Sequence, residues 1–160
     1  MTLRLEEWKM GRIDWGRVLL GGILAGLVIN VSEMILNTVV MGAEFQEAMR
    51  ARNVDPEGAS IGVWIVYAFL LGIVAVTVYA AIRPRFGPGP RTALIAGFLV
   101  WVLTSLFSTI AMLNMGLFPG RLLGVGLVWA LVELLLATLL GAWVYREAEA
   151  PRAASRATAG

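Results

Sequence analysis

Four long apolar stretches are the feature of this chain that most limits how it can fold. Each is long enough to cross the roughly 30 Å hydrocarbon core of a bilayer, which takes about 20 helical residues. They run from about 18 to 41, 61 to 82, 93 to 115 and 122 to 145. Apolar residues follow one another continuously in these stretches instead of alternating with polar ones, which favours helices over barrel strands. The sequence therefore predicts an all-α fold, a four-span transmembrane helical bundle.

The segments between these stretches contain residues that usually end helices. Three prolines and two glycines within 83–91 predict a stiff, non-helical turn after the second span. Residues 118–121, with Pro119 at their centre, predict a second tight break before the fourth span. The connection after the first span is the longest, and it predicts a short interfacial helix at 44–50 and a turn at 55–58. The predicted elements thus form one membrane domain.

The placement of basic residues predicts the orientation. Ten of the 13 lie before the first span, between the second and third, or after the fourth, and three lie in the other two connections. Because positive residues are enriched in cytoplasmic segments, both termini and the 83–91 turn are expected in the cytoplasm. The chain then divides into a cytoplasmic or interfacial segment (1–17), a transmembrane domain (18–146) and a disordered cytoplasmic tail (147–160).

Two absences exclude several kinds of chemistry. The chain has no cysteine and no histidine, so it cannot form a disulfide or use a thiolate or an imidazole as ligand, nucleophile or base. Its formal net charge of +2 is too small, and its arginines too scattered, to indicate a nucleic-acid partner. We therefore expect no cofactor, no metal site, no nucleic acid and no enzymatic activity.

Two glutamates lie inside predicted spans, Glu33 in the first and Glu133 in the fourth. A charged group at the centre of a span costs about 2.5–3.5 kcal/mol on insertion scales, so something should hold each of them. One interpretation is a pair of proton or cation sites in a permeation path. The other is two structural carboxyls, hydrogen-bonded across the bundle to groups such as Asn30 and Asn37. The two spans run in opposite directions, so an offset of roughly 9 Å is expected between the glutamates, which disfavours one shared carboxyl pair.

Small residues share a helical face with each glutamate. The two stripes are Gly22, Gly26, Asn30, Glu33 and Asn37 on the first span, and Gly126, Ala130, Glu133, Ala137 and Gly141 on the fourth. Small residues let helix backbones approach closely in a membrane, so both stripes are predicted to face protein. Residues 26–33 also align without gaps on 126–133, which indicates either an internal repeat or similar packing demands on two helices.

Arg83, Arg85 and Arg91 cluster in the turn after the second span. They are candidates for binding anionic lipid headgroups at the cytoplasmic leaflet. The alternative is that they only set the topology.

The whole chain resembles a family of small bacterial membrane proteins of uncharacterised activity with four predicted spans. The residues that carry the resemblance are Asn30-Val31-Ser32-Glu33 with Asn37, Pro84 to Pro90, and Leu117-Phe118-Pro119-Gly120-Arg121. The resemblance implies a four-span architecture without implying a reaction. We expect the protein in the cell (inner) membrane.

Three functions remain open from the sequence. The first is a non-enzymatic scaffold or a subunit of a homo-oligomer, with the lipid bilayer and a second copy as its partners. The second is a small proton- or cation-coupled transporter or channel that uses Glu33 and Glu133. The third, a membrane enzyme acting on lipids, has the least support, because the loops hold no clustered nucleophile and base.

Overall fold

A computed structural model describes residues 13–54 and 60–147, and within them each predicted span is helical and no strand occurs. The first span is α2 (Trp15–Ile35), continued by the π-helical turn η1 (Leu36–Val40), and the second is α4 (Ile61–Phe86). The third comprises α5 (Pro90–Trp101), the π-helical turn η3 (Val102–Leu106) and α6 (Phe107–Asn114), and the fourth is α7 (Gly120–Glu147). The short α3 (Gly42–Arg50) occurs where an interfacial helix is predicted.

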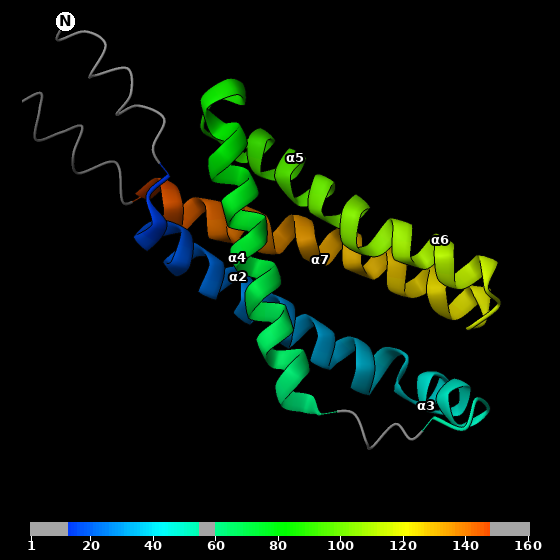
Figure 1. The fold of residues 1–160 in the computed structure, drawn as a ribbon. Helices are drawn as coiled ribbons and strands as arrows, with labels where there is room; N and C mark the ends of the chain where they lie inside the picture. The colour runs from blue at the N-terminus through cyan, green and yellow to red at the C-terminus, as the bar shows by residue number, and fades with distance from the viewer. Residues whose placement is uncertain (1–12, 55–59, 148–160) are drawn as a thin grey trace, which may run out of the picture.

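The helical bundle predicted from the sequence is confirmed (Figure 1). In the described part of the chain, four helices are long and apolar enough to cross a membrane. Large apolar side chains are exposed along all of them, a surface that suits lipid and not water. The protein is therefore a multi-pass helical membrane protein.

The second span ends later than the sequence predicts. The segment 83–91 was predicted to be non-helical throughout, but α4 continues through Pro84 to Phe86. A proline removes only one backbone donor, a loss that transmembrane helices tolerate. The helix ends instead at Gly87, whose φ of 80° suits glycine, and Pro90 opens α5 at the position where proline needs no N–H partner.

Several predicted features lie outside the described residues. These are residues 1–12 of the N-terminal segment, the turn at 55–58 and the tail from 148 onward. The first span begins at Trp15, so the last three residues of the predicted N-terminal segment belong to α2. Glu147, assigned to the tail by the sequence, is the last residue of α7.

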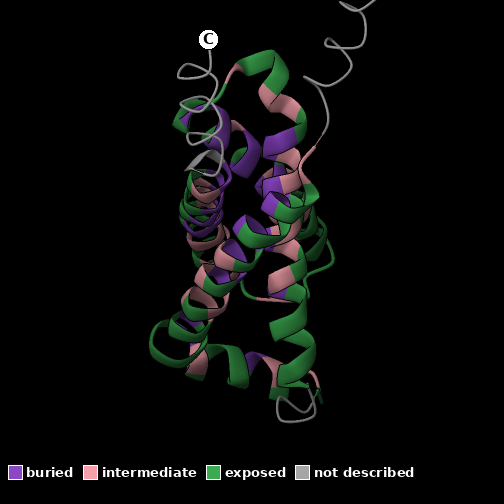
Figure 2. Cartoon of the chain, turned by 90° about the vertical axis from the view of Figure 1, so that its left-hand side faces the viewer, coloured by how far each residue is buried: buried purple, intermediate pink, exposed green. Residues whose placement is uncertain are grey.

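The core of the bundle lies toward the end where α4 turns into α5. Figure 2 shows the buried ribbon concentrated there. Tyr79 is fully buried, and its ring meets that of Tyr145 edge to face with centroids 5.9 Å apart. The guanidinium of Arg83 lies 5.5 Å from the Tyr145 ring, within the range of a cation–π contact. We call this the closed end of the bundle.

Glycines let α2 and α4 approach closely at mid-height. A Cβ added to Gly22 would lie 2.7 Å from the Cα of Ile73, and one added to Gly26 would lie 2.6 Å from the Cα of Phe69. Both contacts are with backbone, which cannot move aside as a flexible side chain can. Gly22 and Gly26 are thus packing positions, although their partner is α4 and not the fourth span.

The contact between α2 and α7 uses a different pair of glycines. A Cβ on Gly21 would lie 2.5 Å from the carbonyl oxygen of Gly141, and one on Gly141 would lie 2.8 Å from that of Gly21. Ala137 is fully buried and Ala130 packs partly against the core. Gly126 differs from the rest of its predicted stripe, because a Cβ there would meet nothing within 4 Å. Its end of α7 is not closely packed.

These glycines support a stability prediction. Gly26→Ala should lower the free energy of unfolding by about 1–3 kcal/mol, because the new methyl group has no space against α4. Gly126→Ala is the matched control, and it should be neutral or stabilising by up to about 1 kcal/mol, since alanine is the better helix former. Unfolding in mixed detergent micelles, followed by far-ultraviolet circular dichroism, measures both. A Gly26 variant as stable as the Gly126 variant would contradict the close approach of α2 and α4.

Candidate functional site

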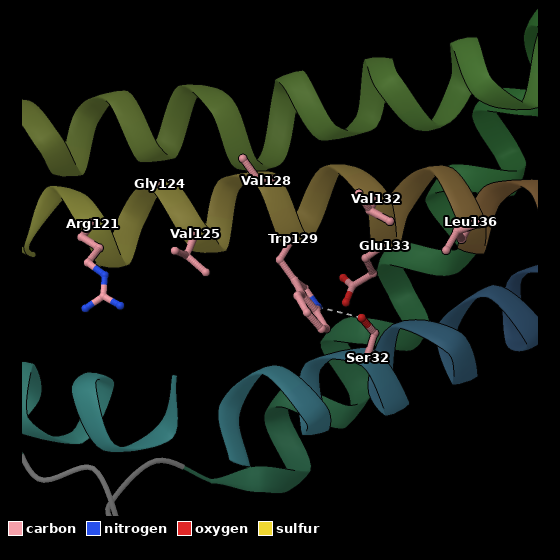
Figure 3. Close-up of a pocket in the computed structure, with 9 residues that line it drawn as sticks. All are labelled: Ser32, Arg121, Gly124, Val125, Val128, Trp129, Val132, Glu133 and Leu136. Carbon is pink, nitrogen blue, oxygen red and sulfur yellow. Dashed lines mark hydrogen bonds between the residues drawn. The ribbon is translucent and has the colours of Figure 1, made fainter. Parts of the chain in front are cut away.

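A cleft of about 830 Å³ opens between α2 and α7, in the half of the bundle away from the closed end. The two helices diverge there, as Figure 1 shows. Ser32 is the lining residue on α2, and eight residues between Arg121 and Leu136 line the cleft from α7 (Figure 3). One helix therefore supplies most of the cleft surface.

The spacing of side chains along α7 explains the character of this surface. Val125, Val128, Val132 and Leu136 recur every three or four residues, so they share one face of the helix. All four are exposed in the described structure. They form an apolar wall along which an elongated molecule could lie.

Trp129 bridges the gap between the two helices beside that wall. Its indole Nε1–H donates a hydrogen bond of 2.9 Å to the Ser32 hydroxyl (Figure 3). A second indole fixes α7 from the other side, where Trp101 Nε1–H donates to the Leu127 carbonyl at 3.0 Å. Both bonds satisfy indole groups that would otherwise be unpaired in an apolar setting.

Glu133 lies one helical turn beyond Trp129 and is the deepest polar group lining the cleft. The residue is only 5% exposed, and its side chain points toward Ser32 (Figure 3). The carboxyl oxygen Oε2 is buried and has no hydrogen-bond partner among the described residues. Of the described ion pairs, Asp14–Arg17 and Glu44–Arg121, neither includes Glu133. A buried carboxyl is therefore left without a positive partner.

Glu33 has a different environment, although it occupies the matching place in the first stripe. Its carboxyl oxygen Oε2 accepts a hydrogen bond of 2.9 Å from Asn37 Nδ2, which also donates to the Glu33 carbonyl at 2.9 Å. Asn30 donates to the carbonyls of Gly26 at 2.9 Å and of Ile65 at 3.4 Å, so it ties α2 to α4. None of these three polar side chains is among the cleft residues.

The short helix α3 covers the end of the cleft that lies farthest from the closed end of the bundle; we call this the outer end of the cleft. Glu44 of α3 pairs with Arg121 of α7 at 2.7 Å, and Phe45 stacks on Phe118 with ring centroids 6.2 Å apart. The guanidinium of Arg52 lies 4.8 Å from the Phe118 ring. Beneath these contacts a small buried cluster joins both sides, made of Leu36, Met41, Ala48 and Leu122. The two diverging helices are thus reconnected beyond the cleft.

The arginines proposed for lipid headgroups lie far from this site. Arg85 and Arg91 are exposed near the α4–α5 turn, at the closed end. Arg83 is half-buried beside Tyr145. The structure therefore does not bring these arginines together with either glutamate.

Sequence reasoning did not identify Ser32, Trp129, Arg121 or Glu44 as site residues. One signal was available for Trp129, which lies within a span and not at its end, where tryptophan usually marks the membrane interface. It also precedes Glu133 by four residues, so the two side chains share a helical face. The pairing with Ser32 depends on how α2 and α7 cross.

Comparisons with protein-family models, with curated proteins and with solved structures find no match to this chain.

The Trp129–Ser32 bond can be tested by a double-mutant cycle. Ser32→Ala and Trp129→Phe should show a coupling free energy of about 0.6 kcal/mol, the average for hydrogen bonds between membrane helices, and no more than about 1.7 kcal/mol. Ser108 provides the control, because its hydroxyl bonds to carbonyls of its own helix, those of Thr104 and Ser105. A cycle of Ser108→Ala with Trp129→Phe should show coupling near zero. Equal coupling in the two cycles would argue against the interhelical bond.

Proposed function

We propose that this protein is a small membrane transporter in which Glu133 binds either a proton or a cation in the cleft between α2 and α7. The observation that carries the proposal is a residue that is 5% exposed, lines a cleft and has a buried carboxyl oxygen with no described hydrogen-bond partner. The proposal selects the transport hypothesis over the scaffold that the sequence placed first.

The physical argument is one of charge balance. An unpaired carboxylate in apolar surroundings is strongly destabilising, so such a group either takes up a proton or attracts a cation. The Arg121 side chain does not neutralise Glu133. It lies 12 positions earlier on α7, about 18 Å away along the axis, and is paired with Glu44. A carboxyl that binds a proton and a cation alternately is the minimum needed to couple proton movement to cation movement across the membrane.

The two glutamates support different roles in this proposal. Glu133 has an unpartnered oxygen and lines the cleft, so it is the exchange site. Glu33 is hydrogen-bonded within its own helix and lies outside the cleft lining, so it acts only through its charge on Glu133. The sequence suggested Glu33 and Glu133 as a pair of proton or cation sites, and this assignment keeps only Glu133.

The distribution of arginines supports an orientation for the transporter. The start of α2 and the end of α7 lie at the same end of the bundle (Figure 1), as an even number of spans requires. With both termini in the cytoplasm of a bacterial cell, the closed end faces inward and the cleft with α3 faces outward. The cleft would then receive its ligand from outside or from the outer leaflet.

A homo-oligomer subunit is the second candidate, favoured by the first turns of α4. Large apolar side chains are exposed there on every face, including Trp64 and Tyr67, whose rings contact each other. No other helix among the described residues covers them, and either lipid or a second copy could do so.

The exchange site predicts selective chemical labelling. Dicyclohexylcarbodiimide is a hydrophobic reagent that modifies protonated carboxyls within membranes. It should label the purified protein in lipid at Glu133, with labelling lost in Glu133→Gln and retained in Glu33→Gln, as mass spectrometry can show. Labelling that survives in Glu133→Gln would contradict the assignment.

Transport itself is tested in proteoliposomes that contain a pH-sensitive dye. In a series of added cations of increasing size, from sodium to tetraethylammonium, at least one should move protons in the wild type and in Glu33→Gln. The same additions should move none in Glu133→Gln or after carbodiimide treatment. A wild type that moves protons with none of these cations, although Glu133 is labelled, would favour the scaffold.

The orientation predicts a particular labelling pattern. Because the chain has no cysteine, single cysteines can be introduced without background. In intact bacterial cells a membrane-impermeant maleimide should modify a cysteine at Ala51, near the end of α3, but not one at Pro88, in the α4–α5 turn. The reverse pattern would place the termini outside.

A further inference from the structure

The walls of the cleft indicate what kind of ligand it accepts. Its volume of about 830 Å³ falls within the roughly 300–1,000 Å³ of pockets for drug-sized molecules. Val125, Val128, Val132 and Leu136 form its long apolar side. A ligand that fills this space must therefore have a large apolar body.

The polar groups of the cleft are too few for an inorganic cation. Ions such as sodium or calcium need several oxygen ligands, and about six to eight in the case of calcium. Near Glu133 the cleft offers one carboxyl and the Ser32 hydroxyl, and Ser32 already accepts a hydrogen bond from Trp129. Nowhere in the described residues do three acidic side chains come together. A bare metal ion would stay poorly coordinated.

Trp129 adds a second group that attracts positive charge. Its Nε1–H is occupied by Ser32, so the polar edge of the indole is satisfied and its ring is left to line the cleft beside Glu133 (Figure 3). Aromatic faces attract cations, tryptophan most strongly, and more so where water is excluded. A carboxylate and an indole one helical turn apart form a site suited to a large, weakly hydrated cation.

We infer that the ligand of this cleft is a lipophilic organic cation, with its charge between Glu133 and Trp129 and its apolar groups against the valine wall. The inference rests on the proposed function, since it names the ligand that exchanges with the proton on Glu133. Arg121 does not oppose it, because Glu44 balances the Arg121 charge at the outer end of the cleft.

A pair of ions that differ in charge sign but not in shape provides the test. Tetraphenylphosphonium and tetraphenylborate are both four-phenyl ions of similar size and high lipophilicity. Equilibrium dialysis of the purified full-length protein in mild detergent should show saturable binding of the phosphonium and none of the borate. Equal binding of both ions would show that the cleft selects apolar bulk alone, as a lipid-chain groove would, and would overturn the inference.

Variants assign the binding to the two residues. Glu133→Gln should weaken phosphonium binding at least about tenfold, whereas Glu33→Gln should change it less than about threefold. Trp129→Leu should weaken it between about three- and thirtyfold, and Trp129→Phe, which keeps an aromatic face, should weaken it less. Glu133→Asp should recover part of the affinity lost in Glu133→Gln. Unchanged elution volume and helicity show which variants fold.

The outcomes separate this inference from the proposed function. Phosphonium binding that is the same in wild type and in a folded Glu133→Gln variant would overturn the inference. So would absence of binding to a wild type whose Glu133 is labelled by the carbodiimide, and that result would leave the exchange site intact. If Glu133 is neither labelled nor required for phosphonium binding, both proposals fail.

Discussion

Close backbone contact at glycines determines the shape of this bundle. Gly22 and Gly26 bring α2 against α4, and Gly21 with Gly141 brings it against α7. Membrane helices have little hydrophobic drive to associate, so such small-residue contacts supply the packing that holds them together. In the first half of α7 a Cβ added to Gly124 or Gly126 would meet nothing within 4 Å, and α2 and α7 separate there (Figure 1). The cleft exists because tight packing is confined to one part of the bundle.

The open half is nevertheless not loose. The Trp129–Ser32 hydrogen bond crosses between the diverging helices, and the Glu44–Arg121 pair joins α3 to α7 beyond it. The first is partly buried and specific, whereas the second is exposed, and exposed pairs contribute only about 0–1 kcal/mol. The inner connection therefore sets the geometry around Glu133. The Glu44–Arg121 pair can break and re-form at little cost.

The sequence is sufficient to predict the four transmembrane helices but insufficient to predict which helices contact each other. Continuous apolar runs fix the spans, because a bilayer leaves the backbone few ways to satisfy its hydrogen bonds. The predicted end of α4 is wrong, because the helix continues through Pro84 and one missing N–H does not end a membrane helix. The stripe of Gly22 and Gly26 was recognisable from its spacing. That it faces α4, and that Gly21 meets Gly141, depends on the crossing of helices, which no single helix encodes.

The surroundings of the two glutamates also depend on how the helices cross. The similar segments 26–33 and 126–133 illustrate this. The aligned residues lie in different surroundings: Gly26 contacts α4 whereas Gly126 faces open space, and Ser32 reaches across to α7 whereas Val132 lines the cleft wall. The aligned residues therefore pack differently in the two helices. Glu33 is satisfied by Asn37 one turn later, but the matching residue after Glu133 is Ala137, which has no hydrogen-bonding side chain. Asn37 thus bonds one Glu33 oxygen, whereas Glu133 Oε2 is buried without a hydrogen-bond partner among the described residues.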